Sequence, residues 1–130
     1  MKMTKVDHLG INTLDIEESV KYYTDMFDFR ETGRADMGPL TLVYMENPEG
    51  IVLELYDLRG NVIPGERPEA LQGFRHVAFF VDDIKAWNER LKSKGAEFTM
   101  ELTRMPQIKR DGILVKDPNG YIIELTAEYK

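Results

Sequence analysis

The sequence contains no cysteine among its 130 residues. This absence excludes disulfide bonds, thiolate zinc sites and a cysteine nucleophile, so nitrogen and oxygen ligands must hold any bound metal. Histidine is also scarce. The chain has only two, His8 and His76. These two side chains are therefore the only imidazoles that the chain can offer to a metal.

Long apolar runs and an excess of positive charge are also absent. No stretch approaches the ~20 apolar residues that cross a bilayer, and the N-terminus lacks the apolar core of a signal peptide. We therefore expect a cytoplasmic protein that does not act at a membrane. The net charge is −6, which disfavours a nucleic-acid partner because phosphate binding requires a basic face.

One short passage occurs twice in the chain. Residues 47–55 (NPEGIVLEL) match residues 117–125 (DPNGYIIEL), so Glu54 corresponds to Glu124. Upstream of each copy lies one histidine, His8 before the first and His76 before the second. The repeat predicts a single domain, residues 1–130, with one module at about 4–58, a linker at 59–71 rich in Gly and Pro, and a second module at about 72–128.

Each module shows the pattern of a strand, a helix and three further strands. The first strands are expected at 5–13 and 74–81, each with its histidine inside the strand. The apolar stripes of the helices follow Asp15 and Asp83, and Gly95 is expected to end the second helix. The remaining strands are expected at 30–32, 40–45, 51–56, 97–102, 113–116 and 121–126. The predicted fold class is α+β, with two tandem βαβββ modules.

The two histidines and two glutamates are candidate ligands of one divalent metal. Glu54 and Glu124 each lie in an apolar strand, where a carboxylate is costly to bury unless it is paired, protonated or bound to a metal. A single strand histidine or glutamate is more often structural or solvated. Duplication of both residue types at matching places favours the ligand interpretation. A set of imidazoles and carboxylates suits Ni, Zn, Co, Fe or Mn better than Ca or Mg.

The chain resembles the vicinal oxygen chelate superfamily, the glyoxalase, bleomycin-resistance and extradiol-dioxygenase group, over nearly its whole length. The resemblance rests on His8 and on the segments 19–23 (SVKYY), 76–83 (HVAFFVDD) and 117–125. It implies paired modules that form a cupped, partly open mixed β-sheet barrel with helices outside. It also implies a homodimer, whose metal site lies within one chain or is shared by two.

The ligand set separates the activities within that superfamily. Extradiol dioxygenases have no ligand at the place of Glu54, so a glutamate there favours isomerases and lyases. The set His8, Glu54, His76 and Glu124 is nearest to glyoxalase I. The resemblance thus implies a metal-dependent lyase or isomerase that stabilises an enediolate on a small carbonyl substrate. Glu124 or Glu54 would transfer the proton.

Several alternatives are compatible with the sequence. These are an extradiol-type Fe(II) dioxygenase, an enzyme like methylmalonyl-CoA epimerase, and a non-catalytic protein that binds a small molecule or antibiotic. The chain also departs from bacterial glyoxalase I, which has an arginine soon after its first histidine to hold the glutathione carboxylate. No basic residue occurs in the segment 9–13 (LGINT). Four bases remain as candidate anion contacts: Arg34, Arg104, Lys109 and Arg110.

Overall fold

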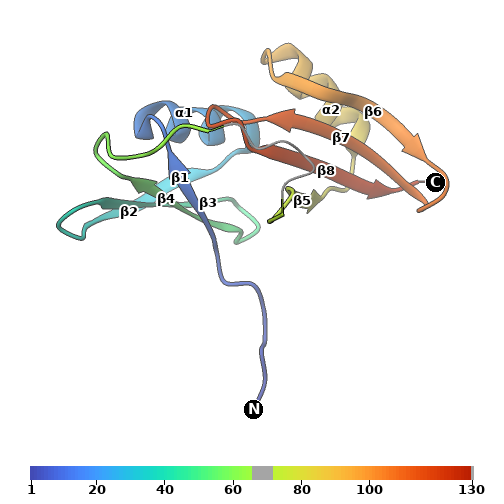
Figure 1. Cartoon of the computed structure of the whole chain (residues 1–130). Helices are drawn as coiled ribbons and strands as arrows, with labels where there is room; N and C mark the ends of the chain where they lie inside the picture. The colour runs from blue at the N-terminus through green and yellow to red at the C-terminus, as the bar shows by residue number, and fades with distance from the viewer. Residues whose placement is uncertain (66–71, 130) are drawn as a thin grey trace. The chain divides into compact units, whose positions relative to one another are not determined.

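The computed structural model describes residues 1–65 and 72–129. The chain divides into two compact units, residues 1–64 and 65–130, and each unit has the element order β-α-β-β-β (Figure 1). This confirms the predicted tandem βαβββ class. Residues 66–71 of the predicted linker lie outside the described residues. Among the described residues, no helix is long and apolar enough to cross a membrane.

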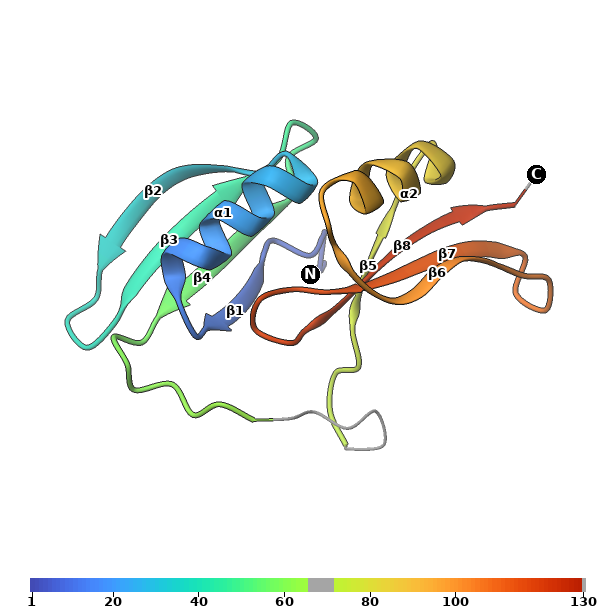
Figure 2. The ribbon, with the colours of Figure 1, turned by 90° about the horizontal axis from the view of Figure 1, so that it is seen from above.

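Unit 1 is a four-stranded mixed sheet with one helix. Its elements are β1 (Leu9–Thr13), α1 (Ile16–Phe27), β2 (Arg30–Asp36), β3 (Thr41–Glu46) and β4 (Val52–Asp57). The strand order is β1-β4-β3-β2, with β1 parallel to β4 and the other neighbours antiparallel. The helix α1 lies along the sheet, in contact with β2 and β4 (Figure 2).

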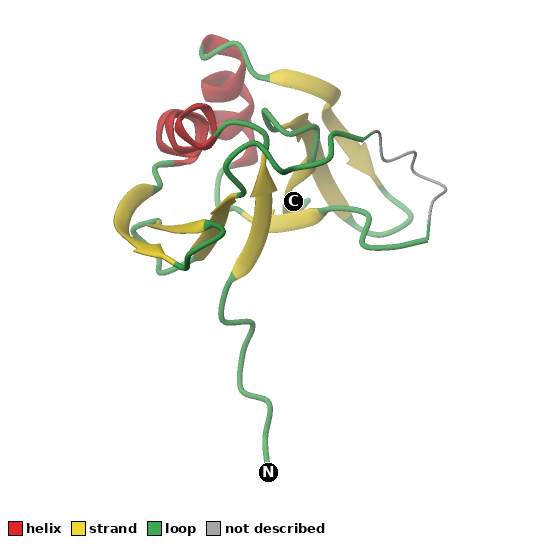
Figure 3. Cartoon of the chain, turned by 60° about the vertical axis from the view of Figure 1, so that its left-hand side comes forward, coloured by secondary structure: helices red, strands yellow, loops and turns green. Residues whose placement is uncertain are grey.

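Unit 2 repeats this arrangement strand for strand. Its elements are β5 (Val77–Phe80), α2 (Ile84–Ser93), β6 (Glu97–Met105), β7 (Arg110–Lys116) and β8 (Ile122–Glu128). The order is β5-β8-β7-β6, again with the first pair parallel. Figure 3 distinguishes the single helix of each unit, in red, from its strands. The duplication in sequence is thus a duplication of topology.

Both helices begin at an aspartate that caps the first turn. The Asp15 carboxylate accepts a hydrogen bond from the Glu18 N–H, and the Asp83 carboxylate accepts one from the Ala86 N–H, both at 3.0 Å. Such bonds satisfy N–H groups that have no partner within the helix. Gly95 follows the end of α2 with a φ of 73°, as expected for a glycine at this position.

The repeated turn passages hold the glutamate strands in place. The Gly50 N–H donates to the Asn47 carbonyl at 3.1 Å, and the Gly120 N–H donates to the Asp117 carbonyl at 3.0 Å. The side chain of the first turn residue also accepts a backbone N–H in each copy, from Ile51 at 2.7 Å and from Tyr121 at 2.9 Å. Each turn therefore fixes where β4 or β8 begins, and with it the position of the glutamate.

The strand that carries each glutamate has two different faces. Leu53 and Leu55 are fully buried on one face of β4, with Val43 and Met45 of β3. Glu54 lies between the two leucines and points to the opposite face, because side chains alternate along a strand. Ile123 and Leu125 repeat this burial in β8. The core therefore occupies one face of each sheet, and the candidate ligands occupy the other.

Some predicted boundaries are wrong. Strands β1 and β5 begin at Leu9 and Val77, so each histidine directly precedes its strand instead of lying inside it. Strands β2, β6 and β7 are longer than expected. Strand β2 is almost wholly exposed, so the apolar alternation that reveals a half-buried strand is missing from its sequence.

Candidate metal centre

Unit 1 brings His8 and Glu54 into contact. His8 Nε2 lies 3.4 Å from Glu54 Oε2. The histidine is positioned by the parallel pairing of β1 with β4, which sets Gly10 beside Glu54. Residues 8 and 10 share a face, so the imidazole and the carboxylate point to the same side of the sheet. Glu54 is only 7% exposed, an unusual degree of burial for a carboxylate.

Unit 2 brings His76 and Glu124 together in the same way. His76 Nε2 lies 2.7 Å from Glu124 Oε2, and β5 pairs with β8 so that Ala78 lies beside Glu124. Among the described residues no three His, Asp or Glu side chains gather within reach of a single ion. Each unit on its own therefore offers two candidate ligands, one histidine and one glutamate.

The chemistry of each pair fits a divalent transition metal. Two ligands at about 2.1 Å from one ion lie about 3.0 Å apart at adjacent octahedral corners and about 3.4 Å apart in a tetrahedron. The N–O spacings of 3.4 Å and 2.7 Å are close to this range. In both pairs the atoms in contact are an imidazole Nε2 and one carboxylate oxygen, the donors that Ni, Zn, Co, Fe and Mn accept.

Two tyrosines surround Glu54, and the sequence did not identify their role. Tyr44 is the cross-strand neighbour of Glu54 on β3, and Tyr56 follows two residues later on β4. Burial and the Glu54 charge raise the pKa of Tyr44, while interaction of the hydroxyl with Glu54 is the main cause of the raised pKa of Tyr56. Both hydroxyls therefore stay protonated at neutral pH.

Glu124 has different neighbours at the matching places. Leu114 replaces Tyr44, and Thr126 replaces Tyr56. The Thr126 hydroxyl donates to the Asp111 carbonyl at 3.2 Å. A side chain added at Gly112 would approach Glu124 Oε1 at 3.5 Å and the methyl groups of both Met100 and Met105. The Glu124 carboxylate thus lies beside thioether and aliphatic groups where Glu54 meets phenols.

Asp7 orients the first histidine. Asp7 Oδ2 lies 2.9 Å from His8 Nδ1, which leaves Nε2 turned toward Glu54. A carboxylate that accepts from the second ring nitrogen fixes the ring and its tautomer in many metal sites. This hydrogen bond is the main cause of the raised pKa of His8; desolvation lowers that pKa, and the charge of Glu54 raises it.

Replacing Asp7 by Asn should lower the pKa of His8 in the metal-free protein. The folded-state pKa lies above the ordinary value of 6.5, so the contact stabilises the fold below about pH 6.5 and is lost as the pH rises through the folded value. An NMR titration of the His8 ring should show a lower midpoint in Asp7→Asn than in the wild type. Glu49→Gln, in the β3–β4 turn, is the control. Equal midpoints in wild type and Asp7→Asn would contradict the orienting role.

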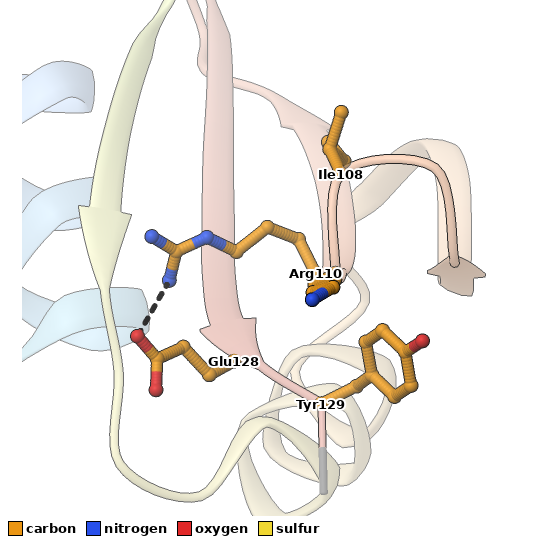
Figure 4. A pocket seen from close by; sticks show the side chains of 5 residues that line it. Ile108, Arg110, Glu128 and Tyr129 are labelled. Atoms are coloured by element: carbon orange, nitrogen blue, oxygen red, sulfur yellow. Dashed lines mark ion pairs between the residues drawn. The ribbon is translucent and has the colours of Figure 1, made fainter.

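The candidate anion contacts are largely paired with acids of their own unit. Arg34 contacts Glu17 and Glu31 at 2.9 and 2.7 Å, and Arg104 contacts Asp111 at 3.0 Å. Lys109 and Arg110 border an open pocket of about 340 Å³ in unit 2, together with Ile108, Glu128 and Tyr129. Figure 4 shows Arg110 reaching toward Glu128, with 4.0 Å between Nη1 and Oε1.

The family model described as the Glyoxalase/Bleomycin resistance protein/Dioxygenase superfamily matches residues 5–125. The match covers both units and includes all four candidate ligands. The chain belongs to this superfamily. The expected resemblance is therefore confirmed at the level of the superfamily, within which ligand sets and activities differ.

Curated relatives in this superfamily include several lactoylglutathione lyases. A lactoylglutathione lyase of Schizosaccharomyces pombe is 29% identical over 98% of this chain, which spans only 49% of that protein. A probable lactoylglutathione lyase of Vibrio parahaemolyticus is 28% identical over 96% of this chain and 91% of its own length. The metallothiol transferase FosB of Bacillus licheniformis is 22% identical over 95% of this chain and 75% of its own length.

A solved superfamily member has the same fold. The glyoxylase/bleomycin resistance protein/dioxygenase domain from Frankia sp. EAN1pec superposes with a TM-score of 0.86 at 20% identity, covering 99% of this chain and 95% of the other. At that identity the likeness shows the fold alone.

Proposed function

We propose that this protein is a metal-dependent isomerase or lyase of the glyoxalase I type, acting on a small carbonyl substrate. In this proposal His8, Glu54, His76 and Glu124 are the ligands of one divalent ion, and the functional form is a homodimer. Each unit contributes one half-site, either to a centre within one chain or to a centre shared by two chains. Ni, Zn, Co, Fe and Mn are the candidate ions.

One observation carries the proposal: both units place a histidine Nε2 against a glutamate oxygen at matching places of a duplicated fold. A buried carboxylate needs a partner, and one such contact could be a structural ion pair. Two contacts of one design, on the face of each sheet opposite its core, are better explained by a shared ligand-binding role. The similarity to lactoylglutathione lyases supports the same activity.

The reaction would be a proton transfer between neighbouring carbons. A bound divalent ion supplies Lewis-acid polarisation of the substrate carbonyl. The carboxylate of Glu124 or Glu54 takes the proton from the carbon beside that carbonyl and returns it to the adjacent carbon. His8 and His76 remain ligands, with the His8 ring fixed by Asp7. Isomerisation needs no oxidant or reductant, because the proton lost from one carbon is regained at the next.

The substrate class that we propose is the hemithioacetal of a 2-oxoaldehyde and a thiol. The names of the relatives support glutathione as the thiol. The segment 9–13, which has no basic residue, supports a different thiol. Assays with glutathione and with a thiol that lacks its two carboxylates would separate these cases. Anaerobic loading with Fe²⁺, followed by oxygen uptake with catechols, would instead identify the dioxygenase alternative.

Adding Ni²⁺, Co²⁺, Zn²⁺ or Mn²⁺ to chelator-treated protein should raise its melting temperature. An ion at 100 times its Kd stabilises the fold by about 2.7 kcal/mol, which for a chain of this size is on the order of 10 °C. Mg²⁺ at the same concentration is the control, because imidazole ligands do not suit it. No shift with any of the four ions, together with metal-free protein after growth in supplemented medium, would refute the proposal.

A further inference from the structure

Unit 2 carries an arginine, Arg110, on the same face of its sheet as Glu124. We propose that Arg110 recognises a carboxylate of the substrate, at the far end of an apolar strip that begins beside Glu124. This inference rests on the proposed function, because it names an anionic group on the substrate of that same centre. In unit 1, by contrast, the segment 9–13 next to Glu54 has no basic residue.

The register of the sheet sets the distance between Arg110 and Glu124. Arg110 of β7 pairs with Glu128, four residues beyond Glu124 on β8, so both side chains lie on one face. The side chain of Arg110 crosses β8, and its Cζ lies 5.5 Å from the centre of the Phe80 ring on β5. Phe80 pairs with Thr126, halfway between the two glutamates. At about 3.3 Å per strand residue, the guanidinium therefore lies roughly 7 to 13 Å along the sheet from Glu124.

The strip between the glutamate and the arginine is apolar. Gly112 lies midway along it on β7, and a side chain added there would meet the methyl group of Met105 at 2.7 Å and that of Met100 at 3.5 Å. Phe80 borders the strip and is 65% exposed, which is unusual for so large an apolar side chain. An aliphatic part of a substrate that covers these groups removes apolar surface from water.

The guanidinium of Arg110 is not held by a close acid. Among the described residues Nη1 has no hydrogen-bond partner, and Glu128 Oε1 lies 4.0 Å away (Figure 4), which is too far for a hydrogen bond. Arg34 and Arg104, in contrast, hold acids at 2.7 and 3.0 Å. Lys109 borders the same pocket and offsets the charge of Glu128. The positive charge of Arg110 therefore suits one carboxylate, which a guanidinium can bind through two parallel hydrogen bonds.

Two hydroxamates that differ in one group test this assignment. Octanohydroxamate offers a metal two neighbouring oxygens and ends in a methyl group, whereas suberic monohydroxamate has the same head and ends in a carboxylate. Each is titrated into Co²⁺-loaded protein, with the visible spectrum of Co²⁺ as the signal. The acid should bind about 5- to 20-fold more weakly to Arg110→Gln than to the wild type, because a charged contact at a partly exposed site is lost. Octanohydroxamate should bind equally to both. Lys92→Gln, on α2 and 44% exposed, should bind both probes like the wild type.

The outcomes separate the inference from the proposed function. Wild-type protein that binds no Co²⁺, Ni²⁺ or Zn²⁺ overturns both. Co²⁺ protein that binds neither hydroxamate, or binds the acid equally well in wild type and Arg110→Gln, overturns the role of Arg110 alone. An equal loss for both probes in Arg110→Gln also overturns it, because the arginine would then be structural. The same holds if Lys92→Gln weakens the acid as much, since the effect would be one of total charge. If Arg110→Gln does not fold, Arg110→Met takes its place in the same comparison.

Discussion

If Glu124 is the general base, a Glu124→Gln variant should lose between about 10²- and 10⁴-fold in kcat, the contribution typical of such a base, while it keeps its fold. Glutamine has nearly the size and shape of glutamate, so the packing beside Gly112 and Leu114 is preserved. It carries no carboxylate to accept the proton, and it is a weaker ligand than a carboxylate for a divalent ion. Metal content and kcat should be measured on the same preparation, in excess Ni²⁺ or Co²⁺.

Glu54→Gln is the matched comparison, because the same change is made at the duplicated position. If Glu54 is a ligand only, its variant should lose metal affinity by a factor of roughly 10 to 100 and recover much of its kcat at saturating metal. Glu128→Gln, on the same strand as Glu124 and largely exposed, should leave both properties unchanged. Retention of metal by both Glu54→Gln and Glu124→Gln would remove these residues from the ligand set.

The sequence was sufficient to predict the fold class, whereas the two His–Glu contacts come from the structure. Repeated turn passages, aspartate helix caps and apolar stripes are local signals, and each predicts an element from a few neighbouring residues. The duplication then supplied the long-range information, because matching places in two modules must occupy matching places in space. The symmetry does not say which histidine meets which glutamate; the parallel pairing of β1 with β4 and of β5 with β8 decides that. Convergence of all four side chains on one ion stays a prediction.

The tyrosines beside Glu54 could not be predicted in the same way, because their positions break the symmetry between the units. Tyr56 could be placed on the face of Glu54 from the alternation of β4 alone. Tyr44 could not, since its position opposite Glu54 depends on the register of β3 against β4. The exposed strand β2 was underestimated for a related reason: its backbone pairing with β3 defines its length, and its side chains carry no apolar pattern.

Leu55→Ala and Leu125→Ala should each lower the free energy of unfolding by about 2–5 kcal/mol, the range for removing a buried leucine side chain. The two residues are 0% and 1% exposed and occupy the duplicated core position next to each candidate ligand. Such a loss is a large part of the 5–15 kcal/mol that stabilises a typical domain. Denaturant unfolding of metal-free protein measures it, with Leu14→Ala as the control because Leu14 is 49% exposed.

Leu55 and Glu54 are neighbours in sequence but point to opposite faces of β4. Their variants should therefore affect different properties, the first stability and the second metal affinity. Leu55→Ala should lower stability strongly and leave Co²⁺ affinity nearly unchanged for the fraction that is folded. Glu54→Gln should lower Co²⁺ affinity and change the stability of the metal-free protein little. A large loss of affinity in Leu55→Ala under conditions where the protein is fully folded would mean that the core face also controls the ligand. The separation of core and ligand faces would then be wrong.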